Sequence, residues 1–371
     1  MLEALETLKT TEPEYYSFAE SSNCLHKTLR RTHKMNILVN GMGNIGTTLV
    51  HLLVKYSEPL GIEKTYLYKR SLHRWNEAER SHIERLGVII CSGENSENLA
   101  SLDSVIGEID YIFEAAANGV GLANLENYRQ LPRLKGSSAQ GSEKGYGIPF
   151  MSGVNDAQIL GEKFVNVVSC NTHGTAAILS TFTGKCLENL KQADIVVVRR
   201  SEDIGNHTRL VSGNVVARHL SEETGTHHAI DVVDMYQTVG IVCPLTSSDI
   251  TTPSQLMHSV RFNIELNEPL AASIDSLIDS NPYLAKTRKF DSNVIFEQGR
   301  RHGFQGRLYS HAIVVMDNFL QTETSLKGWA FVPQEGNSIL STLHAFMLQM
   351  EFEDATILMQ TLKDELLKAE W

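Results

Sequence analysis

The alternation of apolar and polar positions in the first half of the chain predicts short buried strands, each followed by a turn or a helix. Such runs are typical of strands in a parallel sheet that is covered on both faces. Apolar positions at Leu49, Leu52 and Leu53 predict a helix after the first run, and the glycine- and serine-rich segment 135–147 is predicted to be a loop. The predicted strands are 36–40, 65–68, 109–116 and 164–168.

The pattern changes in the second half, where a helix over 175–190 is followed by strands with long connections between them. This arrangement is typical of an α+β domain with a mixed or antiparallel sheet. Pro333 opens a strongly helical last segment, in which Leu343 and Met347 lie on one apolar face that we expect to pack back on the first domain. The predicted strands of this half are 193–200, 240–245, 258–266 and 311–316.

A glycine pattern joins the first strand to the first helix. Gly41, Gly43 and Gly46 form GxGxxG, with the first glycine suited to a tight turn, the second to close approach of a pyrophosphate, and the third to helix packing on the strand. Strand, turn and helix therefore predict a Rossmann-type dinucleotide-binding domain. Its cofactor turn is Gly41, Met42, Gly43, Asn44, Ile45 and Gly46.

Other cofactor contacts are expected at the carboxyl ends of the neighbouring strands. Lys69 and Arg70 stand where an NAD enzyme usually has an acidic residue, so NADP is the expected cofactor and NAD remains possible. The alternative is that both are solvated charges at a strand end. Asn118 and Gly119 form the turn after strand 109–116 and are expected to lie near the same cofactor.

Composition restricts the class of protein. The 371 residues are enough for two domains, and 33 Lys and Arg against 44 Asp and Glu give a net charge of −11, which disfavours nucleic acid or an anionic membrane as partner. Five cysteines lack the spacing of a disulfide framework or a zinc site, so no metal is expected. Since no run approaches about 18 apolar residues and no secretory signal is visible, we expect a cytoplasmic location.

The domain boundaries follow from these patterns. We expect an N-terminal extension (1–34), a dinucleotide-binding domain (35–169), a catalytic domain (170–332) and a C-terminal helical segment (333–371). The extension is predicted to be a weakly ordered appendage, with a docking helix or a targeting segment as alternatives. The fold class is α/β, with a Rossmann-type parallel sheet and a second, mixed α+β domain.

Cys170 lies where the strand 164–168 gives way to a helix start. Unpaired backbone N–H groups and the positive end of a helix dipole favour a thiolate there. A buried apolar cysteine is the alternative. Because a dinucleotide signature lies upstream and candidate bases lie downstream, the combination predicts a thiol-dependent aldehyde dehydrogenase.

Several segments in matching order resemble the archaeal-type, or type II, glyceraldehyde-3-phosphate dehydrogenases. The resemblance covers most of the chain from Met35 to the last helix and also includes Gly141 among the cofactor residues. It rests on NILVNGMGNIG (36–46), AQGSEKG (139–145), VVSCNTHG (167–174), VVVRR (196–200), THH (226–228), TPSQLMHSV (252–260) and FVPQEGNSI (331–339).

The resemblance implies a homotetramer that oxidises glyceraldehyde 3-phosphate to 1,3-bisphosphoglycerate through a thioacyl enzyme, with inorganic phosphate as second substrate. Cys170 would be the nucleophile, His258 the base and later the acid, and Asn171 an oxyanion ligand. From the residues alone, His258 is one of 14 histidines, and a lone histidine at the head of a strand is more often structural. The residues implied near substrate or phosphate are Thr172, His173, Arg199, Arg200, His227 and His228.

Two departures from the family pattern leave the aldehyde open. His173 stands where the family has threonine, and the connection after Arg200 lacks the family's usual Asp-Pro and Gly-Pro-Ile-Asn pieces. One alternative is a semialdehyde dehydrogenase of the aspartate-semialdehyde or N-acetylglutamyl-phosphate type, which uses the same thiol chemistry. Another is a nucleotide-binding regulatory protein with weak or no turnover.

Overall fold

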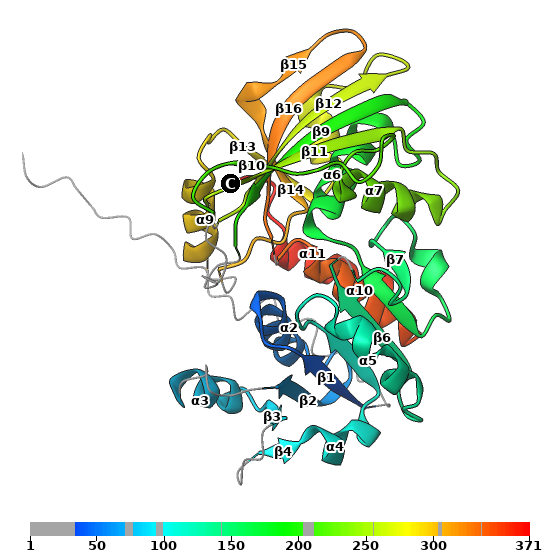
Figure 1. Ribbon diagram of the computed structural model, residues 1–371, viewed down its shortest axis with the longest axis vertical. Helices are drawn as coiled ribbons and strands as arrows, with labels where there is room; N and C mark the ends of the chain where they lie inside the picture. The colour runs from blue at the N-terminus through cyan, green and yellow to red at the C-terminus, as the bar shows by residue number, and fades with distance from the viewer. Residues whose placement is uncertain are drawn as a thin grey trace, which may run out of the picture.

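Two sheets lie at opposite ends of the molecule, with two C-terminal helices between them (Figure 1). The computed structural model describes residues 34–70, 77–93, 99–141, 143–202, 211–254, 256–302, 306–334 and 336–371. The predicted N-terminal extension lies outside the described residues except for Lys34.

The first sheet has eight strands in the order β4-β3-β2-β1-β5-β6-β8-β7, and all its pairings are parallel. This confirms the predicted Rossmann-type sheet. The strands are β1 (Met35–Asn40), β2 (Ile62–Lys69), β3 (Ile89–Ser92), β4 (Ala100–Ser101), β5 (Tyr111–Glu114), β6 (Gly136–Gln140), β7 (Ile148–Phe150) and β8 (Phe164–Val167).

Alternate residues of β1 enter two separate apolar cores. Ile37 and Val39 pack in the core that contains α2 (Asn44–Lys55), α10 (Ile339–Gln349) and α11 (Ala355–Leu366). Leu38 packs on the other face with α4 (Leu102–Val105) and α5 (Val120–Arg129). Because both faces are covered, β1 is buried along its whole length, which explains its uninterrupted apolar run. The first unit also contains α3 (Glu77–Arg85).

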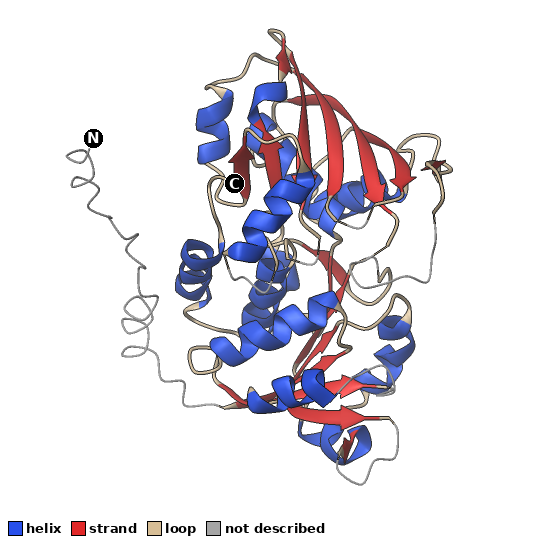
Figure 2. Ribbon diagram, turned by 90° about the vertical axis from the view of Figure 1, so that its left-hand side faces the viewer, coloured by secondary structure: helices blue, strands red, loops and turns tan. Residues whose placement is uncertain are grey.

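The second sheet is mixed and has the order β10-β11-β9-β12-β16-β14-β13, with β15 paired to β16. One face packs on helices α6 to α8. Figure 2 shows helices beside this sheet. The strands are β9 (Leu190–Arg200), β10 (Val215–Val216), β11 (Leu245–Thr252), β12 (His258–Leu266), β13 (Leu284–Thr287), β14 (Ala312–Val315), β15 (Leu320–Gln321) and β16 (Ser325–Val332). The helices are α6 (Cys170–Thr183), α7 (His227–Gln237), α8 (Ile274–Asp279) and α9 (Ser292–Arg301).

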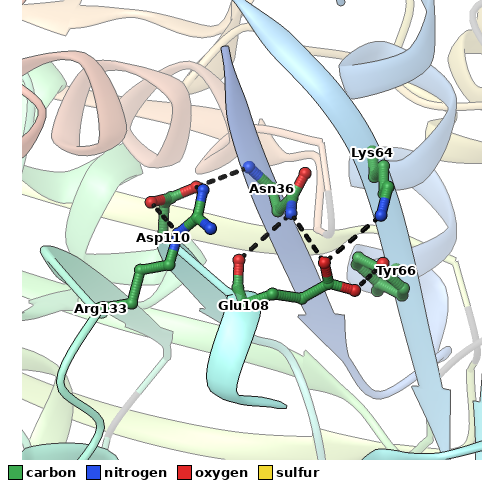
Figure 3. Close-up of polar contacts among 6 residues, drawn as sticks. All are labelled: Asn36, Lys64, Tyr66, Glu108, Asp110 and Arg133. Atoms are coloured by element: carbon green, nitrogen blue, oxygen red, sulfur yellow. Dashed lines mark hydrogen bonds and ion pairs between the residues drawn. The ribbon is translucent and has the colours of Figure 1, made fainter. Parts of the chain in front are cut away.

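A polar cluster fixes the amino end of the first sheet (Figure 3). The Asp110 carboxylate accepts the backbone N–H of Asn36 at 2.8 Å and two N–H groups of Arg133 at 2.9 and 3.1 Å. Glu108 accepts from the Asn36 side chain and from the hydroxyl of Tyr66. Cofactors bind at the carboxyl ends of parallel strands, so this cluster has a structural role.

Three predicted elements were wrong in place or type. Segment 135–147 contains β6, whose Gly136 is required because a Cβ there would lie 2.8 Å from the ring of Tyr111. Segment 240–245 precedes a strand, β11, which pairs in parallel with β9. Helix α6 ends at Thr183 rather than at residue 190, since Gly184 has φ +92°. None of the described helices is both long and apolar enough to cross a membrane.

Candidate active site

Cys170 is the first residue of α6, three residues beyond the end of β8. The N-cap residue is Ser169, whose Oγ accepts the backbone N–H of Thr172 at 3.4 Å. The nucleophile predicted from sequence therefore lies at a helix N-terminus, where the dipole stabilises negative charge on sulfur. Its side chain is partly exposed to a cavity.

This cavity has a volume of about 260 Å³ and joins the starts of α6, α7 and β12 to the end of β9. It brings together seven of the predicted site residues, although they come from distant parts of the sequence. Ser201, Glu202 and Gln334 also line it, and no role was predicted for them. The lining is Ser169, Cys170, Asn171, Arg199, Arg200, Ser201, Glu202, His227, His228, His258 and Gln334.

His258 is almost completely buried at the first position of β12, with 3% of its surface exposed. Its Nδ1 accepts the backbone N–H of Arg200 at 3.1 Å. Burial lowers the pKa of His258 well below its ordinary value, and the positive charges of Arg200 and Arg199 lower it further. The ring is therefore neutral at pH 7.

The opposite wall of the cavity is cationic. His227 and His228 open α7, so backbone N–H groups of a helix start lie beside them. Arg199 is one third exposed, and its Nη1 lies 3.7 Å from Asp249 Oδ1. The Arg200 side chain also makes a contact within the protein, since its Nη1 donates to the backbone carbonyl of Leu256 at 3.2 Å. Guanidinium groups beside a helix N-terminus are suited to phosphate.

His227, His228 and Asp249 carry donor atoms that lie within 4.8 Å of one another, a residue set that binds transition metals in other proteins. The surroundings favour an anion instead, because Arg199 and the start of α7 place positive charge there. Burial lowers the pKa of His228 well below its usual range, and His227 and Arg199 contribute to this.

Thr172 and His173, predicted to lie near substrate or phosphate, are not among the residues that line the cavity. Both are completely buried. The His173 Nδ1 lies 3.0 Å from Ser169 O, and its Nε2 lies 2.8 Å from the Oγ of Ser341 in α10. Residues two and three positions after Cys170 on a helix point to another side. The His173 side chain therefore links α6 to α10, whereas Thr172 Oγ1 lies 2.9 Å from Ser169 Oγ at the start of α6.

The glycine turn fits a pyrophosphate. Gly41 has φ +98°, and a Cβ at Gly46 would lie 2.0 Å from Gly41 O, so neither position accepts a side chain. Gly43 is the N-cap of α2 and has open space beyond its Cα. The start of α2, with Met42, Asn44 and Ile45, is therefore accessible to a phosphate group.

Lys69 and Arg70 lie beside this turn, since the backbone N–H of Gly41 donates to Tyr68 O at 3.0 Å. Lys69 ends β2 and Arg70 is exposed. Both are therefore at the edge where the adenosine ribose of a dinucleotide would lie.

The turn at Asn118 and Gly119 has a carboxylate that was not predicted. Glu143 accepts the backbone N–H groups of Gly119 and Leu122, and thus occupies the start of α5. An anion at this helix start disfavours a cofactor phosphate.

A second cavity of about 250 Å³ lies at the carboxyl ends of β6 and β8 and shares Ser169 with the first. Gly141 lines it. So does Asn166, whose buried Oδ1 has no hydrogen-bond partner among the described residues. The Nζ of Lys144 lies 3.0 Å from Oδ1 of Asp231 and 3.2 Å from Oδ2 of Asp234. These ion pairs join the loop after β6 to α7.

Asn337 is a site residue that sequence reasoning missed. It is completely buried, and its Nδ2 donates to Cys170 O at 2.9 Å and to His311 O at 3.0 Å. It thereby ties the nucleophile's backbone to the segment before α10. Asn337 lies within FVPQEGNSI (331–339), one of the segments that carry the family resemblance. The neighbouring sequence does not indicate which residues this asparagine contacts.

No family model matches the chain. Glyceraldehyde-3-phosphate dehydrogenase of Pyrococcus abyssi is 28% identical over 279 residues, which are 71% of this chain and 76% of that protein. The enzyme of the same name from Saccharolobus solfataricus is 24% identical over the same shares of both chains. That of Methanothermobacter thermautotrophicus is 30% identical over 46% of this chain and 49% of its own.

The family resemblance is confirmed. Archaeal glyceraldehyde-3-phosphate dehydrogenases match most of the chain, and the described fold has the parallel sheet and second mixed sheet expected from that resemblance.

Proposed function

We propose that the chain is an NAD(P)-dependent aldehyde dehydrogenase that oxidises glyceraldehyde 3-phosphate to 1,3-bisphosphoglycerate, or catalyses the reverse reduction. The observation that carries this proposal is one cavity containing Cys170, His258 and a cationic wall. The relatives bear the name of this activity. A nucleophile beside a phosphate-binding wall is what a phosphorylated aldehyde and inorganic phosphate require.

The cavity residues divide into reacting and binding groups. The Cys170 thiolate adds to the aldehyde carbon, and after oxidation the resulting thioester is attacked by phosphate, with the thiolate leaving. Asn171 and backbone N–H groups at the start of α6 lie near the carbonyl oxygen. Arg199, His227 and the start of α7 would hold the phosphate groups.

The cofactor is NADP or NAD, which supplies the hydride acceptor when bound. Gly41 to Gly46 would hold its pyrophosphate. The second cavity, between Gly141 and Ser169, is the place for the nicotinamide because it adjoins the cavity of Cys170. The unpartnered Asn166 Oδ1 there suits the N–H of a carboxamide.

Lys69 and Arg70 should make the protein prefer NADP. Changing both to Ala should reduce NADP affinity about 10- to 150-fold for each charged hydrogen bond lost, from about 1.5–3 kcal/mol per bond, and leave NAD affinity nearly unchanged. Titration of both cofactors at one ionic strength measures this. Arg129→Ala, an exposed arginine on α5 that pairs with Glu126, is the control. Equal NADP and NAD affinities in the unmodified protein would mean that the two cations are solvated.

The function is tested by assaying the purified full chain with glyceraldehyde 3-phosphate, with each cofactor, and with and without inorganic phosphate. We expect cofactor reduction that depends on both substrates, because the thioester needs an acyl acceptor. Aspartate semialdehyde and N-acetylglutamate semialdehyde are the comparison substrates. Turnover with a semialdehyde alone would move the assignment to that enzyme class, and cofactor binding without turnover would favour a regulatory protein.

We also propose a homotetramer, as the family resemblance implies. One face of the second sheet lies opposite α6 and α7. Three apolar residues are partly exposed on this face, namely Val196, Val198 and Ile250. An apolar strip on an open sheet face is suited to contact with another copy.

A further inference from the structure

An anion does not explain every group in the cationic wall of the cavity. Asp249 is a buried carboxylate with 3% of its surface exposed, and its Oδ1 has no hydrogen-bond partner among the described residues. His228 is also almost completely buried, and both of its ring nitrogens lack such a partner. A phosphate would be repelled by this carboxylate. A bound cation would satisfy both residues, and buried polar atoms are rarely left without a partner.

The distances between these groups suit a tetrahedral metal ion. His228 Nε2 lies 3.5 Å from Asp249 Oδ2 and makes no hydrogen bond with it. Two ligands at about 2.0–2.2 Å from a tetrahedral Zn²⁺ lie about 3.3–3.6 Å from each other. His227 completes the set, since its donor atom and those of the other two residues all lie within 4.8 Å of one another. Three protein ligands leave a fourth position open to water.

The backbone fixes the two elements that carry these groups. The two histidines open α7, and the carboxylate lies on β11. Gly225 has φ +84°, and a Cβ there would lie 2.1 Å from Ser247 O, so only glycine allows this close approach to β11. The backbone N–H of Thr226 donates to Ser247 O at 3.0 Å, and that of Ala229 donates to Ser247 Oγ at 3.0 Å. Ligands on fixed elements lose little conformational entropy when a metal binds.

The neighbouring charges determine which metal fits. Arg199 Nη1 lies 3.7 Å from Asp249 Oδ1, so it opposes a cation that is held by charge alone. Imidazole nitrogens bind transition metals such as Zn²⁺, whereas Mg²⁺ and Ca²⁺ take oxygen ligands. The Arg199 side chain is one third exposed and can turn toward solvent when a metal binds. The cluster therefore selects a transition metal over Mg²⁺.

We propose that His227, His228 and Asp249 form a binding site for Zn²⁺ and that the bound metal inhibits the enzyme. Binding of the metal goes beyond the proposed function, whereas the inhibition rests on it. Both histidines line the cavity of Cys170, which has a volume of about 260 Å³. A His227 ring that coordinates a metal no longer binds a phosphate group, and the metal with its water fills part of this small cavity. Metal and substrate therefore exclude each other.

Cobalt(II) reports on this site without any substrate. In buffer without phosphate, the purified full chain should give the strong visible absorption of tetrahedral Co²⁺, which Zn²⁺ should displace and Mg²⁺ should not. His227→Gln, at a partly exposed position, should weaken Co²⁺ binding more than about 100-fold, because loss of an outer-shell partner alone costs about 10–100-fold. Asp249→Asn should have the same effect. The control is His219→Gln, an exposed histidine that contacts Ser248 of β11 and should be dispensable for the spectrum.

Cys170 is the competing ligand, since a thiolate in the same cavity also binds Zn²⁺. Sulfur coordinated to Co²⁺ adds an absorption band in the near ultraviolet, which we expect to be absent, and Cys170→Ser should keep the visible spectrum. A near-ultraviolet band that disappears in C170S would overturn the proposal. So would a visible spectrum that survives in both H227Q and D249N.

The inhibition is measured as single-turnover cofactor reduction with glyceraldehyde 3-phosphate, again without inorganic phosphate. Zn²⁺ should slow this step in the unmodified chain, and H227Q should need more than about 100-fold more Zn²⁺ for the same fractional loss. Equal sensitivity of the two proteins would refute inhibition through this site. A chain that gives the expected Co²⁺ spectra but oxidises no aldehyde would support the metal site and contradict the proposed function.

Discussion

Cys170→Ser should abolish aldehyde oxidation, with a loss on the order of 10⁴–10⁶-fold, as for removal of other catalytic nucleophiles. A serine hydroxyl at the start of α6 is not ionised at neutral pH and is therefore a much weaker nucleophile than a thiolate. Steady-state cofactor reduction with glyceraldehyde 3-phosphate measures the loss. Iodoacetamide should inactivate the unmodified protein in parallel.

The matched control is Cys186→Ser, because Cys186 is an exposed cysteine outside both cavities. Its activity should stay within about 2-fold of the unmodified protein, since surface substitutions change little. Cofactor titration should give the same affinity for C170S as for the unmodified chain. Full turnover in C170S would remove the covalent mechanism, whereas lost cofactor binding would mean that the substitution disturbed the fold.

Features that depend on a few neighbouring residues could be predicted from the sequence. The positive φ of Gly41 and the close approach of Gly46 follow from GxGxxG between a strand and a helix. The position of Cys170 at a helix start follows from the change of an apolar run into small residues. In both cases the chemistry is set by a local backbone shape, and local sequence specifies that shape.

Features that depend on distant partners could not be predicted. β6 consists of GSSAQ, which has little strand propensity, and it is a strand because it pairs in parallel with β5 and β8, which are distant in the sequence. His173 was expected near the phosphate groups because it follows Cys170 closely in the sequence. Three residues along α6, however, its side chain points away from the cavity and toward Ser341. The Asn337 side chain donates to Cys170 O, although the two residues are 167 positions apart in the sequence. The hydrogen bond from the backbone N–H of Arg200 to Nδ1 of His258 depends on the register of β12 with β9.

Acid should destabilise the protein strongly, because several histidines in the described part of the chain are buried in the neutral form. Burial lowers the pKa of His173 to about 4 and the pKa values of His228, His258 and His311 well below 6.5. Between the lowered pKa values of the folded chain and the ordinary value of 6.5, the unfolded chain binds protons that the folded chain does not. The free energy of unfolding is therefore highest above about pH 6.5 and falls as the pH decreases.

The expected size of this effect is large. At pH 5 a histidine that stays neutral in the folded protein should lower the free energy of unfolding by about 2 kcal/mol relative to pH 8, against a typical total of about 5–15 kcal/mol. Glu114, whose pKa is raised by burial, offsets part of the loss. Urea unfolding followed by circular dichroism from pH 8 to pH 5 measures the free energy of unfolding. A constant free energy over this range would mean that the buried rings are solvated or paired.

His311→Phe separates this cause from general acid effects. Both ring nitrogens of His311 are buried without a hydrogen-bond partner among the described residues, and the ring stacks on Tyr283 at 4.2 Å, a contact that phenylalanine can keep. Overpacking would shift the stability at every pH equally, whereas removal of the titrating ring reduces the slope by about one proton between pH 6 and 5. H82Q, at an exposed histidine, should leave the slope unchanged. A variant H311F that keeps the full slope would show that His311 is not one of the groups responsible.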